Sequence, residues 1–175
     1  MAKRILCLML LCLSGRGEAD MAFTGNLLDR PCQLDPTSAT QDVVFMQTAL
    51  PQFHHAPGRS PAKRFPIRLL NCQAASIGKV VKVAFSGEAE QGLPGALKVT
   101  GVNVGRLAIQ LVDADGQTPL ALGDAHRAGN GDVINAEELT LNFSAYVQAT
   151  PEALAERSVT AGEYSAIATF EINYQ

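Results

Sequence analysis

The closing segment, Glu163–Gln175 (EYSAIATFEINYQ), constrains the fold of this chain more than any other stretch. Apolar residues occupy every second position and mostly polar residues lie between them, a period of two that predicts a strand with one buried face. The apolar positions are Tyr164, Ala166, Ala168, Phe170, Ile172 and Tyr174. A strand this apolar needs a neighbour on each side, because an open edge offers unpaired backbone groups to other chains. The fold therefore has to supply a cover for this strand.

The frequency of turn residues predicts that this strand is one of many. The chain has 175 residues, with 15 glycines and 9 prolines along its length and Val, Ile and Thr recurring between them. That composition is typical of short strands joined by turns, and the length is sufficient for one domain with a hydrophobic core. The formal charge of −3 is small and evenly spread, which argues against nucleic acid or an anionic membrane as a partner.

Residues 1–19 have the pattern of a signal peptide. Lys3 and Arg4 precede the apolar run Ile5–Leu13, and small residues follow at the positions that a signal peptidase reads. An apolar run of nine residues is too short to cross a bilayer, which needs about twenty. A buried helix is the alternative interpretation.

We expect cleavage between Ala19 and Asp20, and cleavage after Ala22 is the alternative. Residues 20–175 then form a single domain. Its formal charge is −5, because cleavage removes three basic residues and one acidic residue from a chain of charge −3.

Two of the four cysteines remain after cleavage, namely Cys32 and Cys72. Two cysteines in an exported chain most simply form one disulfide. Closing a loop of about forty residues contributes about 3–4 kcal/mol in the chain-entropy model. Free or metal-binding thiols are the alternative, but no CxxC motif or second ligand pair supports them.

Turn signals divide the middle of the chain into short strands. The predicted strands are Phe65–Cys72, Lys79–Phe85, Arg106–Val112, Thr118–Leu122 and Leu139–Ala149. Asp42–Met46 is a further short apolar run, Pro51–Pro66 a predicted surface loop and His126–Asp132 a glycine-rich turn. Thr150-Pro151-Glu152 has the cap, first-turn proline and acidic residue of a helix start. Some seven or eight short strands in this arrangement predict an all-β, antiparallel sandwich.

Candidate chemical sites are weak throughout the sequence. His54 and His55 are adjacent, so their side chains point apart, and no carboxylate lies near them in sequence. Asp113 and Asp115 resemble the start of a calcium loop but lack its later ligands, so a hairpin turn is favoured. Asn142 begins a glycosylation sequon inside a predicted strand, which chance explains better. We expect no enzyme activity, metal, cofactor or small-molecule substrate.

Three segments together resemble the pilins of the chaperone–usher pathway. They are FTGNLLDRPCQLD (Phe23–Asp35), the strand Phe65–Cys72 ending in Asn-Cys, and Ala166–Gln175 with its penultimate Tyr174. Each motif alone is weak, but their order and spacing span nearly the whole mature chain. Three further segments resemble the adaptor subgroup, which joins the thin tip fibre of a pilus to its rod. They are PGRSP (Pro57–Pro61), LPGALKVTGVNVGRL (Leu93–Leu107) and AYVQATPEAL (Ala145–Leu154).

The resemblance implies an incomplete immunoglobulin-like sandwich that lacks its seventh strand. In the family, a donor strand from a periplasmic chaperone or from the neighbouring subunit completes it. The closing strand then lines an acceptor groove, and the chaperone holds the terminal carboxylate of Gln175. The implied acceptor and chaperone-binding residues are Tyr164, Ala166, Ala168, Phe170, Ile172, Tyr174 and Gln175.

The N-terminal arm, residues 20–27, is the implied donor to another subunit. Its donor face consists of Met21, Phe23, Gly25 and Leu27, and the glycine allows close backbone approach in the groove of the neighbour. The arm before Gly25 is short, which fits the adaptor subgroup; cleavage after Ala22 nearly abolishes it.

The expected function is that of a structural minor pilus subunit, an adaptor that supports host-cell adhesion. The expected partners are a periplasmic pilus chaperone, an outer-membrane usher and neighbouring pilus subunits. The expected location is the extracellular fimbrium of a Gram-negative bacterium, reached through the periplasm. The alternatives are a rod or tip-fibre pilin, a sugar-binding tip adhesin, which carries an extra receptor-binding domain in this system, and an exported enzyme with a sandwich fold.

Overall fold

The computed structural model describes residues 31–175. The predicted signal peptide (1–19), its cleavage site at Ala19 and Asp20, and the donor arm with Met21, Phe23, Gly25 and Leu27 lie outside the described residues. No helix in the described part of the chain combines the length and apolarity needed to cross a membrane.

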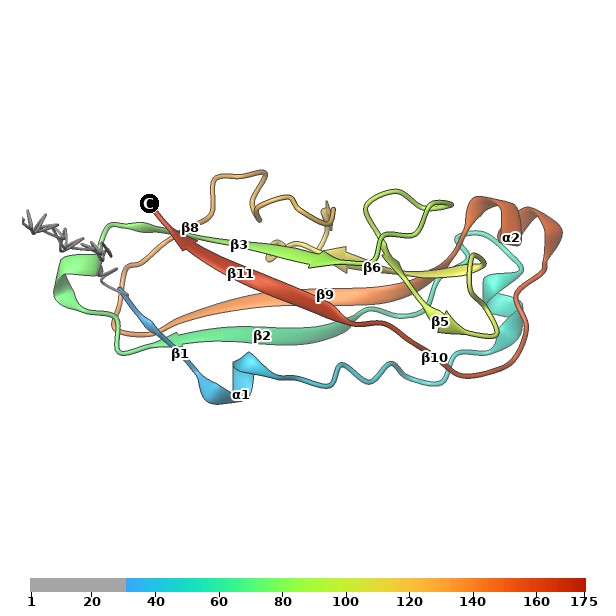
Figure 1. The fold of residues 1–175 in the computed structure, drawn as a ribbon, viewed down its shortest axis with the longest axis horizontal. Coiled ribbons are helices and arrows are strands. Elements are labelled where there is room, and N and C mark those ends of the chain that lie inside the picture. Colours follow the sequence, from blue (N-terminus) through green and yellow to red (C-terminus); the bar gives the residue numbers. More distant parts are fainter. Residues whose placement is uncertain (1–30) are drawn as a thin grey trace, which may run out of the picture.

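The larger sheet forms one layer of a sandwich (Figure 1). Its strand order is β1-β2-β9-β6-β4, with β7 paired to β6, and every pairing is antiparallel. The strands are β1 (Gln33–Leu34), β2 (Lys63–Leu70), β4 (Leu97–Lys98), β6 (Leu107–Val112), β7 (Pro119–Leu120) and β9 (Leu139–Ala149).

The second layer contains two smaller sheets. One has the order β11-β3-β8, from β3 (Val80–Gly87), β8 (Asp132–Val133) and β11 (Ala168–Tyr174). The other pairs β5 (Thr100–Gly101) with β10 (Tyr164–Ser165). Four short helices connect the strands: α1 (Pro36–Ala39), the 3₁₀ turns at Leu50–Phe53 and Ala74–Ser76, and α2 (Pro151–Glu156).

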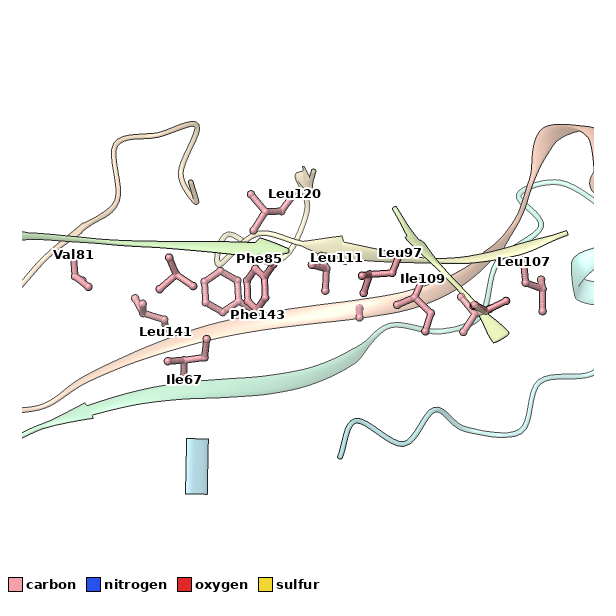
Figure 2. Packing of buried hydrophobic residues seen from close by; sticks show 14 of the residues in the cluster. Ile67, Val81, Phe85, Leu97, Leu107, Ile109, Leu111, Leu120, Leu141 and Phe143 are labelled. Atoms are coloured by element: carbon pink, nitrogen blue, oxygen red, sulfur yellow. The ribbon is translucent and has the colours of Figure 1, made fainter. Parts of the chain in front are cut away.

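Aromatic side chains from both layers meet in the core. The rings of Phe85 on β3 and Phe143 on β9 pack edge to face with centroids 5.1 Å apart, and Figure 2 shows them side by side between the two strands. Phe65 on β2 stacks against Phe143 at 6.1 Å. Such ring pairs contribute about 0.5–1.5 kcal/mol beyond the area that they bury. These contacts hold the layers together at the middle of the sandwich.

Most sequence-based element predictions are confirmed. β9 has the predicted bounds, and β2, β3 and β6 begin and end within two residues of theirs. The predicted helix start is also correct, because the Thr150 hydroxyl accepts a hydrogen bond from the Ala153 amide at 3.3 Å and Pro151 follows as the first helical residue. The strand count is eleven in the described chain, above the expected seven or eight, because short two-residue pairings add to the long strands.

Two segments contain a buried residue that was not predicted from the sequence. Pro51–Pro66 is not simply a surface loop, since a 3₁₀ turn within it buries Phe53. The glycine-rich turn His126–Asp132 contains a fully buried residue, His126. The His126 ring accepts a hydrogen bond from the Val83 amide at its Nδ1 (2.9 Å), and its Nε2 lies 3.1 Å from an Asp132 carboxylate oxygen. Because Nδ1 accepts, the ring proton is on Nε2 and is donated to Asp132.

The predicted disulfide joins Cys32 to Cys72, two buried residues 40 positions apart. It lies beside the pairing of β1 with β2. We expect the double substitution Cys32→Ala and Cys72→Ala to lower the free energy of unfolding by about 3–4 kcal/mol, because the unfolded chain gains the entropy of an open loop. Urea unfolding of both proteins measures this, and reduced wild type should match the variant. A loss below about 1 kcal/mol would contradict the chain-entropy account.

The turn between β6 and β7 generates a pH-dependent prediction. Hydrogen bonds from the Thr118 hydroxyl, and then from the Gln117 and Thr118 amides, lower the pKa of Asp115 from 3.8 to about 2. A lowered pKa in the folded state stabilises the fold above pH 3.8, and this contribution is lost as the pH falls through about 2. We expect Asp115→Ala to have a lower free energy of unfolding than wild type at neutral pH. The difference should disappear as the pH falls from 3.8 to about 2. Urea unfolding midpoints of both proteins, measured at each pH, test this. A difference between the two midpoints that does not change with pH would contradict it.

Candidate functional site: an open strand edge

β11 is paired on one side only within residues 31–175. Its partner is β3, and β11 is the terminal strand of that sheet (Figure 1). Val80 and Gln175 exchange two backbone hydrogen bonds of 2.8 Å, which makes them a hydrogen-bonded pair of the ladder. Such pairs alternate along an antiparallel ladder, so the backbone groups of Glu171 and Asn173 point toward β3. Those of Phe170 and Ile172 point toward the open edge.

Phe170 and Ile172 also form the apolar face of β11 that is directed toward the core. Phe170 and Ile172 are half-buried and contact the core, while Glu171 and Asn173 are exposed. The Phe170 ring lies 6.1 Å from that of Phe85. Full burial of one such side chain contributes about 1.5–3 kcal/mol, so covering the half that remains exposed is worth about 1 kcal/mol for each. Among the residues that the structure describes, the open edge therefore combines unpaired backbone groups of Phe170 and Ile172 with a partly uncovered apolar face.

The predicted continuous strand Tyr164–Tyr174 is wrong at its middle. The chain leaves the pairing with β5 after Ser165 and joins β3 at Ala168, so two sheets share what looks like one alternating segment. Gly87 on β3 permits this switch, because the Ile167 carbonyl oxygen lies 2.9 Å from where a Cβ would be. Ile167 is 84% exposed there. Ala168, predicted to be on the buried face, is also exposed, since its single methyl group beside the break does not reach the core.

Three of the remaining predicted acceptor residues contact the core. Tyr164, Ala166 and Tyr174 are half-buried and contact the core, as Phe170 and Ile172 do. Burial raises the pKa of Tyr164. Gln175 is exposed and ends the ladder through its pairing with Val80.

One residue of the site escaped the sequence analysis. Phe45 lies in the segment 41–49, which forms no strand, and its ring centroid is 6.3 Å from that of Tyr164. Val43 and Phe45 are half-buried, whereas Val44 and Met46 are exposed. The sequence showed Asp42–Met46 only as a continuous apolar run, so the alternation in burial comes from the structure. Periodicity did not reveal that the run lies beside β10.

Other candidate sites do not assemble in the described chain. Residues 31–175 contain no group of three His, Cys, Asp or Glu side chains placed to hold a metal ion. His54 Nε2 instead lies 2.9 Å from the Val159 carbonyl oxygen. Asp113 and Asp115 accept hydrogen bonds from nearby backbone amides within the hairpin and its neighbouring turn. Two surface cavities, one beside Arg106 and one beside Arg59, include no residue of β11. Pairing with another strand is the chemistry that the open edge supports.

A family model described as "Fimbrial protein" matches residues 21–175. The chain belongs to the fimbrial protein family. This fimbrial chain is 48% identical over 178 residues to the fimbrial adapter PapK of Escherichia coli, with 100% of both chains covered. It is also 32% identical to the major MR/P fimbria protein of Proteus mirabilis, over 91% of this chain and 86% of that protein.

Solved fimbrial structures share its fold. The crystal structure of the P pilus rod subunit PapA aligns with a TM-score of 0.68 at 27% identity, covering 83% of this chain and 100% of that one. A subunit in the structure of a chaperone–usher pilus aligns with a TM-score of 0.67 at 27% identity, covering 91% and 97%. The incomplete immunoglobulin-like sandwich, the role as a pilus subunit and the fimbrial location expected from the sequence are thereby confirmed.

The ladder geometry predicts an alternating pattern of amide hydrogen exchange along β11. The Glu171 and Asn173 amides should exchange slowly because they pair with β3, and those of Phe170 and Ile172 should exchange quickly because they face the open edge. Residue-resolved exchange measured by NMR on the full-length fimbrial chain tests this. Uniform protection of all four amides would show that the edge is closed.

Proposed function

We propose that this subunit is an adaptor that joins the tip fibre of a pilus to its rod by exchanging strands with its neighbours. The observation that carries the proposal is the open edge of β11, where Phe170 and Ile172 present both unpaired backbone groups and half-covered side chains. An added strand satisfies both at once, through main-chain hydrogen bonds and apolar burial. The proposed position as an adaptor within the pilus is supported by the 48% identity to fimbrial adapter PapK over the full chain.

The acceptor site of the proposal is the open edge itself. An incoming strand lies along β11 and contacts Tyr164, Ala166, Phe170, Ile172 and Tyr174. Phe45 extends the apolar contact at the β10 end through its ring pair with Tyr164. β11 carries a single charged residue, the exposed Glu171, so the inward face suits an apolar donor. The periplasmic chaperone occupies this edge first, with the terminal carboxylate of Gln175 as its second anchor.

The donor of the proposal is the arm at residues 20–27, with Met21, Phe23, Gly25 and Leu27 as its apolar face. After chaperone-assisted export, the outer-membrane usher brings the arm to the open edge of a different subunit. One surface of the chain thus accepts a strand while a separate segment donates one. An adaptor needs both, because it connects two unlike neighbours.

Substitutions in the arm test the donor role. We expect Met21→Asp and Phe23→Asp to leave the subunit bound to the chaperone but unable to enter a neighbour, because burying an unpaired carboxylate is unfavourable. Thr24→Asp, on the opposite face of the arm, is the matched control and should behave as wild type. The measurement is the rate at which purified chaperone–subunit complexes exchange strands with an acceptor subunit. Normal exchange by both apolar-face variants would refute the donor assignment.

Self-assembly distinguishes an adaptor from a rod or tip-fibre pilin. An adaptor accepts one kind of neighbour and donates to another, so the purified subunit alone should form no long polymer. Addition of a rod or tip subunit should instead yield short, defined complexes in size-exclusion chromatography. Long fibres formed by the purified subunit in electron micrographs would favour a rod or tip-fibre role.

A further inference from the structure

A second surface of this subunit lies on the outer face of the larger sheet. On β9 the residues Leu141, Phe143 and Val147 point into the core, so their neighbours along the strand point outward. On β2 the core-facing residues are Ile67 and Leu69. The outward residues of the two strands, with one loop residue that joins them, are Arg59, Arg64, Pro66, Arg68, Leu70, Thr140, Asn142, Ser144, Tyr146 and Gln148. Ser144 and Tyr146 are buried.

Three arginines on this face form a straight row, which we call the arginine stripe. Arg59 is bridged to Gln148, Arg64 lies opposite Ser144, and Arg68 lies opposite Thr140. The partners on β9 are spaced four residues apart, which corresponds to about 13 Å between neighbouring arginines. All three arginines are exposed.

No arginine of the stripe forms an ion pair within the described chain. The ion pairs of residues 31–175 involve Lys98, His126 and Arg127, and none includes a stripe residue. The pKa of Asp35 is lowered mainly by hydrogen bonds from Thr37, and the positive charge of Arg68 lowers it by a smaller amount. No outward position of β2 or β9 carries a carboxylate. This face is therefore positive on a chain whose formal charge is −3.

Arg59 connects the stripe to a surface cavity. Its guanidinium lies over the Tyr146 ring, 5.0 Å from the centroid, a cation–π contact that orients the side chain. Arg59 also lines a cavity of about 510 Å³, together with Pro51, Ala56 and Pro57. That volume is within the range of small-molecule pockets, so the cavity can accept an apolar side chain. We call it the proline-lined cavity.

We propose that the arginine stripe and the proline-lined cavity together bind an extended acidic polypeptide segment that carries an apolar side chain at one end. Carboxylates spaced along the segment pair with Arg64 and Arg68, since a guanidinium binds a carboxylate through two parallel hydrogen bonds. The apolar side chain enters the cavity beside Arg59. The cavity favours a polypeptide over a sulfated polysaccharide, which offers no apolar anchor. This face is on the opposite sheet from β11, so both surfaces can be occupied together.

A peptide binding experiment tests the proposal on the purified full-length protein. The probe is a fluorescent peptide of about nine residues, alternating glutamate and threonine and ending in leucine, which spans the stripe at strand spacing. We expect Arg64→Gln combined with Arg68→Gln to weaken binding by about fivefold or more, as does added salt. The matched control is Lys79→Gln combined with Arg106→Gln, which removes the same charge from exposed residues elsewhere and should leave binding unchanged.

The cavity is tested separately. Replacing the leucine of the probe by threonine should weaken binding to wild type, and Gln52→Trp, which fills the cavity from its rim, should abolish that difference. Equal binding by the stripe variant and its control would overturn the proposal, as would no binding at all. A heparin oligosaccharide that binds more tightly than the peptide, with the same loss in the stripe variant, would assign the stripe to a polysaccharide instead.

Discussion

The one-sided pairing of β11 with β3 is the interaction on which the open edge of the described chain depends. It holds Phe170 and Ile172 against the aromatic core while leaving their backbone groups directed outward. A strand paired on both sides would have no free hydrogen-bonding groups, and an unpaired strand would not keep its apolar face aligned. Within residues 31–175, β11 therefore has one open edge, and β3 holds the strand in register along the other.

β3 can act as this support because its other edge is secured. Beyond its short pairing with β8, β3 is held by a loop: the His126 amide donates to the Val83 carbonyl, and the His126 ring accepts from the Val83 amide. Asp132 holds the far side of the ring and in turn accepts from Arg127. A buried polar network of this kind is favourable only when each member has a partner. The buried histidine therefore stabilises β3, the strand that positions the open edge of β11.

An incomplete sandwich also has to keep enough stability without its missing strand. The free energy of unfolding of a domain is a small difference between the large contributions of apolar burial and conformational entropy. Each apolar side chain left uncovered therefore lowers it appreciably. Here the disulfide between Cys32 and Cys72 ties β1 to the end of β2, in the layer that does not contain the open edge. The cluster of Phe65, Phe85 and Phe143 links the two layers. The disulfide therefore lies away from β11, whereas the aromatic cluster reaches it through the contact between Phe85 and Phe170.

The sequence by itself determined the local features whose physical causes are local. The alternation in Leu139–Ala149 predicted β9 with its correct bounds, and Thr150 and Pro151 predicted the start of α2. The predicted disulfide between Cys32 and Cys72 is also present. The closing segment predicted an apolar strand in need of a cover. Only the tertiary structure decided that this segment divides between β5 and β3, that Phe45 lies beside Tyr164, and that His126 is buried. Each of these depends on contacts between residues distant in the chain, and periodicity reports which face of a strand is apolar, not which element lies against it.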